Sequence, residues 1–319
     1  MILETKGIHP KIAMGVRCRL LGLSRQAHYQ HQWRSIEESL GQDLVLQEVR
    51  FIRKQHPAIG TRKLFAMLKS FLDDHKIKMG RDALFDLLAE HKLLIIKRRR
   101  KVRTTFSAHG MRKYSNLIKD VVPACANKIW VSDITYYKIG DEHVYISFVT
   151  DAYSRKILGY QVADTLHAVN SVKALQMAIQ GVNTNFIGLI HHSDRGSQYC
   201  SADYVAVLEK HKVAISMTET SDPRDNAIAE RVNGIIKEEY LNYYLIKTKK
   251  EIEEKLHEAV HNYNHHRPHL SCNMHTPADV HHNGLTTLRL WKNYYKKPII
   301  VNVKQDCPET VNQYQDFIH

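Results

Sequence analysis

The chain has 319 residues, of which 43% are hydrophobic and 25% charged, and its net charge is +13. This apolar fraction excludes a generally disordered chain, and the length suits two or three domains. No apolar run approaches the roughly 18–20 residues needed to cross a bilayer. The five cysteines are scattered without a Cys-x-x-Cys pair, which argues against a disulfide framework. We therefore expect a soluble, cytoplasmic protein that does not act at a membrane.

The positive charge is concentrated at the start of the chain. Residues 1–120 hold 25 of the 46 lysines and arginines but only 11 of the 33 acidic residues, so residues 121–319 are close to neutral. A solubilising surface would spread this charge along the whole chain. A basic N-terminal region followed by a nearly neutral region indicates that residues 1–120 bind a polyanion and that residues 121–319 have a different function.

The basic region is predicted to be helical. Between Pro10 and Arg34, a Leu-Gly-Leu turn precedes Ser24, a good N-cap, and Arg25 begins the next helix. This pattern fits a helix-turn-helix, in which Arg25 would contact DNA, but it also fits an ordinary αα-hairpin. Three short amphipathic helices are expected over 43–94, as a DNA-binding unit or a simple helical bundle. The basic run that starts at Lys97 reads as an interdomain linker.

From Lys128 the pattern changes to strands. Ile129–Tyr137, His143–Asp151 and Lys156–Val162 are predicted as three consecutive strands because β-branched and aromatic residues predominate. Helices and strands then alternate, which predicts an α/β fold with a mixed sheet covered by helices on both faces. The expected later elements are helices over 168–182, 201–211, 227–240 and 249–264 and strands over 186–193 and 214–217.

Three acidic residues occupy special positions in this predicted core. Asp133 lies inside the first strand, where a carboxylate is costly unless something stabilises it. Asp194 follows a buried strand, at the sheet edge where α/β active sites gather. Glu230 lies near the start of a helix, on one face with Asn233 and Lys237. The spacing therefore places all three helix side chains on the same side.

Carboxylates gathered in this way are typical of a site for hard cations. Mg²⁺ binds through one or two protein carboxylates together with phosphate oxygens, and two such ions about 4 Å apart can catalyse phosphoryl transfer. We expect Asp133 to lie between two ions, with Asp194 on one and Glu230 on the other. Two of these acids also have simpler interpretations, because Asp194 fits a turn and Glu230 fits a helix-dipole role. Asp151, at the end of a strand, is a rival ligand that also fits a turn.

Four sequence motifs follow one another along the predicted core. They are Trp130-Val-Ser-Asp133-Ile-Thr-Tyr, Asp151-Ala-Tyr-Ser-Arg-Lys-Ile-Leu-Gly-Tyr160, His192-Ser-Asp194-Arg-Gly-Ser-Gln-Tyr199 and Asp225-Asn-Ala-Ile-Ala-Glu230. Together they resemble the integrase-type catalytic core of bacterial insertion-sequence transposases, and in particular the second-reading-frame product of the IS-three family. The 35 residues between Asp194 and Glu230 are the interval by which this Asp-Asp-Glu family is usually described.

The resemblance extends to both sides of the core motifs. Ile59-Gly-Thr-Arg62-Lys-Leu resembles the glycine-arginine element of the family's upstream helix-turn-helix, with Ile59 where an aromatic residue is more usual. Tyr263-Asn-His-His-Arg267-Pro-His resembles the motif that closes the core. Residues 284–319 match no pattern known to us. The resulting division is an N-terminal helical segment (1–42), a helical DNA-binding domain (43–96), a basic linker (97–121), an RNase H-like core (122–283) and a C-terminal tail (284–319).

The resemblance implies a transposase that cuts the ends of an insertion sequence and joins a 3′-hydroxyl to target DNA. It implies Asp133, Asp194 and Glu230 as catalytic ligands of two Mg²⁺ or Mn²⁺ ions. The expected DNA contacts are Lys237, Asn233, Arg62, Arg25 and Arg267. The expected partners are double-stranded DNA of the terminal inverted repeats and the target, further copies of the chain, and a first-frame protein with a helix-turn-helix and a leucine zipper. We expect the protein to associate with the nucleoid.

Three alternatives remain at this point. The histidine-rich stretch that includes His261 and His265 fits a structural zinc site, although paired cysteines are missing. A nuclease with the same metal site would not need the basic helical region. A DNA-binding regulator that has lost catalysis would not need Asp133 and its partners. There is no phosphate-binding Gly-x-x-x-x-Gly-Lys loop, so nucleotide hydrolysis is not supported.

Overall fold

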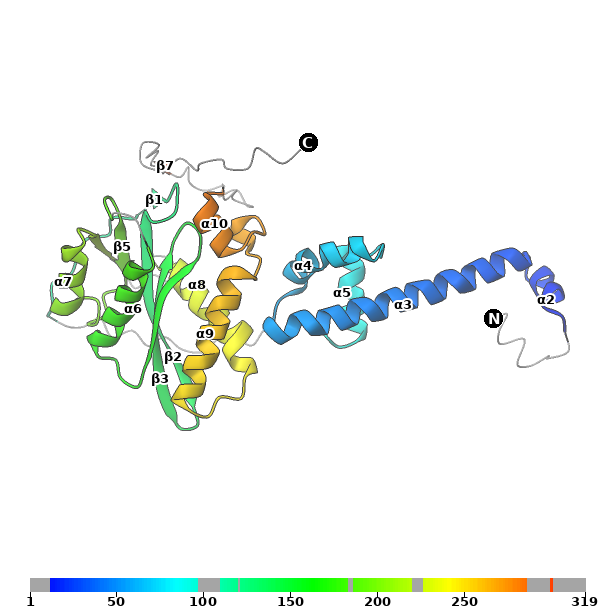
Figure 1. The fold of residues 1–319 in the computed structure, drawn as a ribbon, viewed down its shortest axis with the longest axis horizontal. Helices are drawn as coiled ribbons and strands as arrows, with labels where there is room; N and C mark the ends of the chain where they lie inside the picture. Colours follow the sequence, from blue (N-terminus) through cyan, green and yellow to red (C-terminus); the bar gives the residue numbers. More distant parts are fainter. Residues whose placement is uncertain are drawn as a thin grey trace, which may run out of the picture. The chain divides into compact units, whose positions relative to one another are not determined.

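The computed structural model describes residues 12–96, 110–119, 121–182, 186–219, 226–285 and 299–300. The chain divides into two compact units, one of Met1–Ile52 with Leu68–Leu94 and one of Arg53–Met67 with Ile95–His319 (Figure 1). Residues 97–109, which contain the predicted basic run, and the tail residues 286–298 and 301–319 lie outside the described residues. No described helix is both long and apolar enough to span a membrane.

The first unit is helical, as predicted. Helix α2 (Met14–Leu20) leads through Gly22, at φ +69°, into helix α3 (Arg25–Gln55), whose first turn is capped by Ser24: its Oγ accepts a hydrogen bond from the Ala27 amide at 3.0 Å. Helix α3 runs without a break through residue 42, where the sequence analysis placed a domain boundary. Helices α4 (Thr61–Asp74) and α5 (Arg81–Glu90) complete the helical region.

The second unit is built on a five-stranded mixed sheet with the order β4-β3-β2-β5-β6. Strands β2, β3 and β4 are antiparallel neighbours, whereas β5 and β6 join them in parallel. This topology confirms the predicted mixed sheet. Strand β5 is shorter than predicted, because it begins at residue 190 rather than 186. The strands are β2 (Ile129–Ile139), β3 (Glu142–Asp151), β4 (Ile157–Ala163), β5 (Ile190–Ser193) and β6 (Ala214–Met217).

Helices cover both faces of this sheet, also as predicted (Figure 1). Ile146 and Phe148 of β3 pack in one apolar cluster with helices α8 (Ala227–Ile235) and α9 (Lys249–His265). Val149, which points to the other face, packs in a second cluster with α6 (Ala168–Gln180) and α7 (Ala202–Lys210). The remaining elements are a π-helical turn η1 (Ile236–Tyr240), short 3-10 turns η2 (Leu241–Tyr243) and η3 (Leu270–Cys272), helix α10 (Pro277–Asn283), and strands β1 (Val121–Val122) and β7 (Ile299–Ile300).

Gly159 allows helix α6 to lie directly against strand β4. A Cβ atom added at this position would collide with the backbone oxygen of Ala174 and would meet the backbone nitrogen of Ala178 at 2.8 Å. We expect Gly159→Ala to lower the free energy of unfolding by about 3 kcal/mol, because backbone atoms must separate to make room. Urea unfolding checks this, with Gly80→Ala as the control because a Cβ there meets nothing within 4 Å. Equal losses in both variants would contradict the argument.

Candidate active site

Strands β2 and β5 bring two of the predicted acids to one level of the sheet. These parallel strands pair from Ile129↔Ile190 to Val131↔His192. Asp133 and Asp194 each lie two residues beyond the last pair, so the strand alignment places them side by side. Asp194 follows the end of β5, as predicted, and its Oδ1 accepts a hydrogen bond from the Gly196 amide at 3.0 Å.

Helix α8 brings the third acid to the same strand. Asn226, just before α8, donates a hydrogen bond from Nδ2 to the backbone oxygen of Ser132 at 2.9 Å. Two helical turns later, Asn233 Nδ2 donates a hydrogen bond to Asp133 Oδ2 at 2.8 Å. Glu230 lies between these two amides at helical spacing, so it belongs to the face of α8 that follows β2. Residues 220–225, which precede α8, lie outside the described residues.

Lys237 continues this contact along the same strand. Its Nζ donates to the backbone oxygen of Tyr136 at 2.7 Å and to Thr135 Oγ1 at 3.3 Å, and it lies 4.6 Å from the centre of the Tyr136 ring. Lys237 is part of the π-helical turn η1 rather than of the straight helix expected over 227–240. Helical spacing therefore correctly predicted that Asn233 and Lys237 share a face, but it did not reveal that both bind the strand that carries Asp133.

Asp194 and Glu230 act electrostatically on Asp133. Burial, followed by the negative charge of Asp194 and then that of Glu230, raises the pKa of Asp133 to about 8, although hydrogen bonds from Ile134 and Asn233 act in the opposite direction. A carboxyl group in this state is stabilised by a nearby cation. The donor set is entirely oxygen, which is the preference of Mg²⁺ and Mn²⁺ rather than of softer metals.

Among the residues that the structure describes, no group of three or more His, Cys, Asp or Glu side chains is arranged to hold one metal ion. This finding is compatible with the predicted donor set, because each ion would need only two of its ligands from the protein, with Asp133 shared. It also gives no support to a zinc site in the histidine-rich stretch. His261 and His265 do lie close together, with ring centres 4.9 Å apart.

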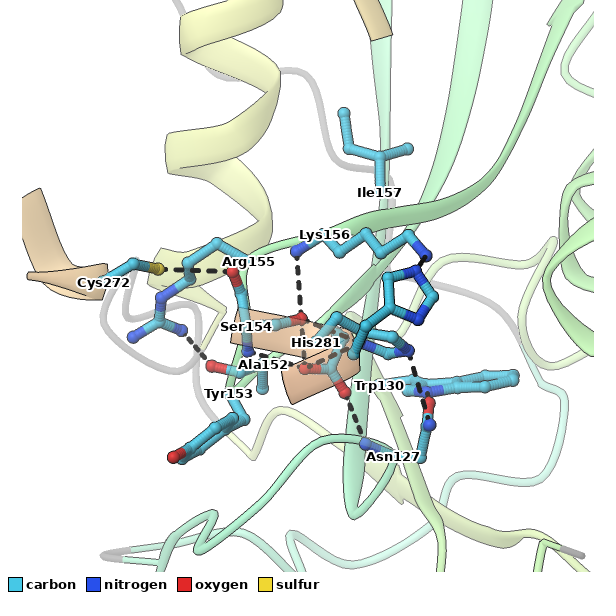
Figure 2. A network of polar contacts seen from close by, with 12 residues as sticks. Asn127, Trp130, Ala152, Tyr153, Ser154, Arg155, Lys156, Ile157, Cys272 and His281 are labelled. Atoms are coloured by element: carbon cyan, nitrogen blue, oxygen red, sulfur yellow. Dashed lines mark hydrogen bonds and ion pairs between the residues drawn. The ribbon is translucent and has the colours of Figure 1, made fainter. Parts of the chain in front are cut away.

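Asp151, the rival ligand, has a structural role. Its side chain is fully buried, and it accepts hydrogen bonds from the Asn127 amide at 2.8 Å and from both the amide and the hydroxyl of Ser154 at 2.7 Å (Figure 2). Burial alone would raise its pKa, but His281 and Ser154 hold it below the usual value. The Asp-Ala-Tyr-Ser sequence is thus a side-chain-stabilised turn, which was the alternative that the sequence analysis left open.

A buried hydrogen-bond network underlies the site, and the sequence analysis did not detect it. His191 Nε2 is 2.7 Å from Ser132 Oγ and 2.9 Å from the Tyr204 hydroxyl, and His192 Nδ1 is 2.9 Å from Ser216 Oγ. These contacts connect β2, β5, β6 and α7, and Ser132 and the two histidines lie one to three residues before Asp133 or Asp194 in the chain. Adjacent histidines in a short strand gave no periodic signal by which this network could be recognised.

Three buried histidines predict that the protein is destabilised by acid. Burial is the first cause that lowers the pKa of His56 to about 4, of His191 to about 3 and of His269 to about 2. The stability that such a group contributes is fully present above its unfolded pKa near 6.5. Below that pH, the free energy of unfolding falls by about 1.4 kcal/mol per pH unit for each group, until the folded pKa is reached. Asp133, whose pKa is raised, acts in the opposite direction. We therefore expect the free energy of unfolding to fall from pH 6.5 to pH 4.5, as measured by urea titration. A constant value over this interval would contradict the prediction.

The remaining predicted DNA contacts differ in accessibility. Arg25 and Arg62 are exposed in the first turns of α3 and α4. Arg267, in contrast, is only 1% exposed and makes two hydrogen bonds of 2.9 Å to Glu239. The expected DNA contact by Arg267 is therefore wrong, because DNA cannot reach a guanidinium group that is enclosed in the protein and neutralised by a carboxylate.

Comparison with known proteins identifies an integrase core domain in this chain. Two family models, both described as "Integrase core domain", match residues 123–223 and 211–277. The "Insertion element IS600 uncharacterized 31 kDa protein" of Shigella sonnei is 32% identical over 231 residues, which cover 71% of this chain and 83% of that protein. The "Transposase for insertion sequence element IS629" of the same organism is 29% identical over 64% of this chain and 67% of that protein.

Two further proteins are similar to smaller parts of this chain. "Transposase InsF for insertion sequence IS3fB" of Escherichia coli K12 is 35% identical over 127 residues, which cover 40% of this chain and 44% of that protein. The HTLV-2 integrase catalytic core, solved in complex with magnesium, is 20% identical and covers 50% of this chain and 98% of that chain, with a TM-score of 0.41. The family matches, the relatives and the RNase H-like sheet show that this chain belongs to the insertion-sequence transposases, polynucleotidyl transferases with an integrase-type catalytic core.

Proposed function

We propose that this transposase cuts the ends of an insertion sequence and joins them to target DNA by a two-metal mechanism that uses Asp133, Asp194 and Glu230. The observation that carries the proposal is the docking of α8 on β2, where the amides of Asn226 and Asn233 flank Glu230 and bind the strand beside Asp133. The effect of the Asp194 and Glu230 charges on the pKa of Asp133 supports the same grouping.

The carboxylates would hold two Mg²⁺ or Mn²⁺ ions, with Asp133 shared and with Asp194 and Glu230 each on one ion. Such ions, when bound, activate the attacking oxygen and neutralise the leaving oxygen in a phosphoryl transfer. Asn233 fixes the orientation of the Asp133 carboxylate through its 2.8 Å hydrogen bond. The network around His191 keeps β2 and β5 in register below the site.

DNA would approach the exposed cations that lie outside this carboxylate cluster. Lys237 is held on β2 next to the site, and its charge suits a phosphate of the terminal DNA. Arg25 and Arg62 are exposed at helix starts in the basic N-terminal region and would contact the inverted repeats. We further propose that the active form is an oligomer on DNA and that a first-frame protein can join it.

Joining of a pre-cut element end to plasmid DNA tests the proposal. The wild-type protein is expected to join the end in the presence of Mg²⁺ or Mn²⁺ and to lose this activity with EDTA. Cleavage without joining would favour the nuclease alternative. Binding of the terminal repeats without either reaction would favour a DNA-binding regulator. Joining that is unaffected by EDTA would exclude the metal mechanism.

A further inference from the structure

A largely buried triad of charged side chains forms around Glu239, in the turn η1 that follows helix α8. Glu239 receives two hydrogen bonds from Arg267, Nε to Oε2 and Nη2 to Oε1, each of 2.9 Å. Lys63 Nζ approaches the same carboxylate at 3.1 Å. Burial alone would raise the pKa of Glu239, but Arg267 and Lys63 hold it below its usual value. The carboxylate therefore remains charged and bound on two sides.

Glu239 belongs to the π-helical turn η1, which follows α8 without interruption and contains Lys237. A π-helical turn inserts an extra residue into a helix; such turns are rare and are frequently found at functional sites. Here the turn lies between α8, which carries Glu230, and Tyr240. Because Lys237 is only two residues before Glu239, the position of the carboxylate determines where Lys237 lies on β2.

The segment 53–67 holds this turn through two further contacts. The Ala58 amide donates to the backbone oxygen of Glu239 at 3.2 Å, and His56 Nδ1 is 2.9 Å from the Tyr240 hydroxyl. The sequence analysis assigned these residues to the DNA-binding domain 43–96, but the structure groups 53–67 with the catalytic unit. The glycine-arginine element thus contributes Lys63 to the catalytic unit, while the adjacent Arg62 remains exposed.

Stability alone does not explain a buried triad with two cations and one carboxylate. Removing three charged groups from water costs several kcal/mol for each ion, and apolar side chains of similar volume are often at least as stabilising. The paired hydrogen bonds of an arginine to a carboxylate, however, impose a specific direction on both groups. The triad is therefore suited to fixing the geometry of η1.

We propose that Glu239 is a positioning residue, which Lys63 and Arg267 hold so that the turn η1 keeps Lys237 on strand β2 beside Asp133. This inference rests on the proposed function for the role of Lys237. The proposal gives the Arg-Pro-His motif and the glycine-arginine element the same role. Both hold the turn η1 that follows helix α8. The proposal also makes the placement of Lys237 depend on residues 53–67.

A double-mutant cycle on the full-length protein tests the proposal. Glu239→Gln is expected to reduce the rate of strand transfer at least tenfold, and Lys237→Ala is expected to reduce it similarly. If Glu239 acts through Lys237, adding Glu239→Gln to the Lys237→Ala protein lowers the rate by less than about twofold. A merely structural role would give independent effects whose fold-changes multiply, and that result would overturn the proposal. Glu238→Gln, an exposed residue of the same turn, is the matched control and should retain the wild-type rate.

Hydrogen exchange gives a measurement that does not depend on activity. Glu239→Gln should accelerate amide exchange in both 236–240 and 53–67, whereas exchange in the strands β2 and β3 should be unchanged. Lys63→Met, which removes one cation and retains an apolar side chain of similar length, should show the same pattern if Glu239→Gln does not fold. Unchanged exchange in 236–240 would overturn the positioning role. An inactive wild-type protein would contradict the proposed function instead, and the exchange measurement would still decide the role of Glu239.

Discussion

Replacement of Asp133 by Asn is expected to reduce strand transfer by at least about a thousandfold, which corresponds to roughly 4 kcal/mol of transition-state stabilisation. Asp133 is the carboxylate that Asn233 binds directly and whose pKa responds to both Asp194 and Glu230. An amide at this position retains the shape of the side chain but removes the charge that both metal ions would share. Single-turnover joining of a pre-cut end measures the loss, and Asp194→Asn and Glu230→Gln should cause losses of the same order.

Asp133→Asn should not destabilise the protein. A loss of activity in this variant can therefore be distinguished from a loss of folding. In the absence of metal, the Asp133 carboxylate is destabilised by burial and by two neighbouring acids, so an amide should leave the free energy of unfolding unchanged or increased. Asp141→Asn, in an exposed hairpin turn, is the matched control and should retain full activity. Joining by Asp133→Asn at the wild-type rate would exclude this residue from the active site.

Replacement of Asp151 by Ala is expected to have the largest effect on stability, about 3–5 kcal/mol. The buried carboxylate accepts hydrogen bonds from the Asn127 amide and from the amide and hydroxyl of Ser154, and His281 lies 3.9 Å away. Alanine would leave these donors without this acceptor in the protein interior. Urea unfolding followed by circular dichroism measures the loss.

The exposed Asp141→Ala is the control for this prediction and should change the free energy of unfolding by no more than about 0.5 kcal/mol. Its side chain makes a surface ion pair with Lys138 at 3.7 Å. A loss below about 1 kcal/mol for Asp151→Ala would contradict the structural role. If Asp151→Ala retained the fold but lost metal-dependent joining completely, Asp151 would instead be a candidate metal ligand.

The sequence alone determined the class of fold and the candidate acids. The predominance of β-branched and aromatic residues predicted the three consecutive strands, and the later alternation of helix and strand predicted the mixed sheet that the structure has. These predictions succeeded because local hydrophobic patterns are set by which face of an element is buried. The face shared by Glu230, Asn233 and Lys237 could be read in the same way, because helical spacing is a local property.

Only the tertiary structure decided the roles that depend on contacts between distant parts of the chain. Arg267 and Asp151 carry charges that sequence analysis associates with DNA or metal, yet both are buried in structural contacts. The π-helical turn and its triad join residues 63, 239 and 267, which no local pattern connects. A charged residue is costly to bury unless a partner is present, and that partner is chosen by the fold rather than by sequence neighbours.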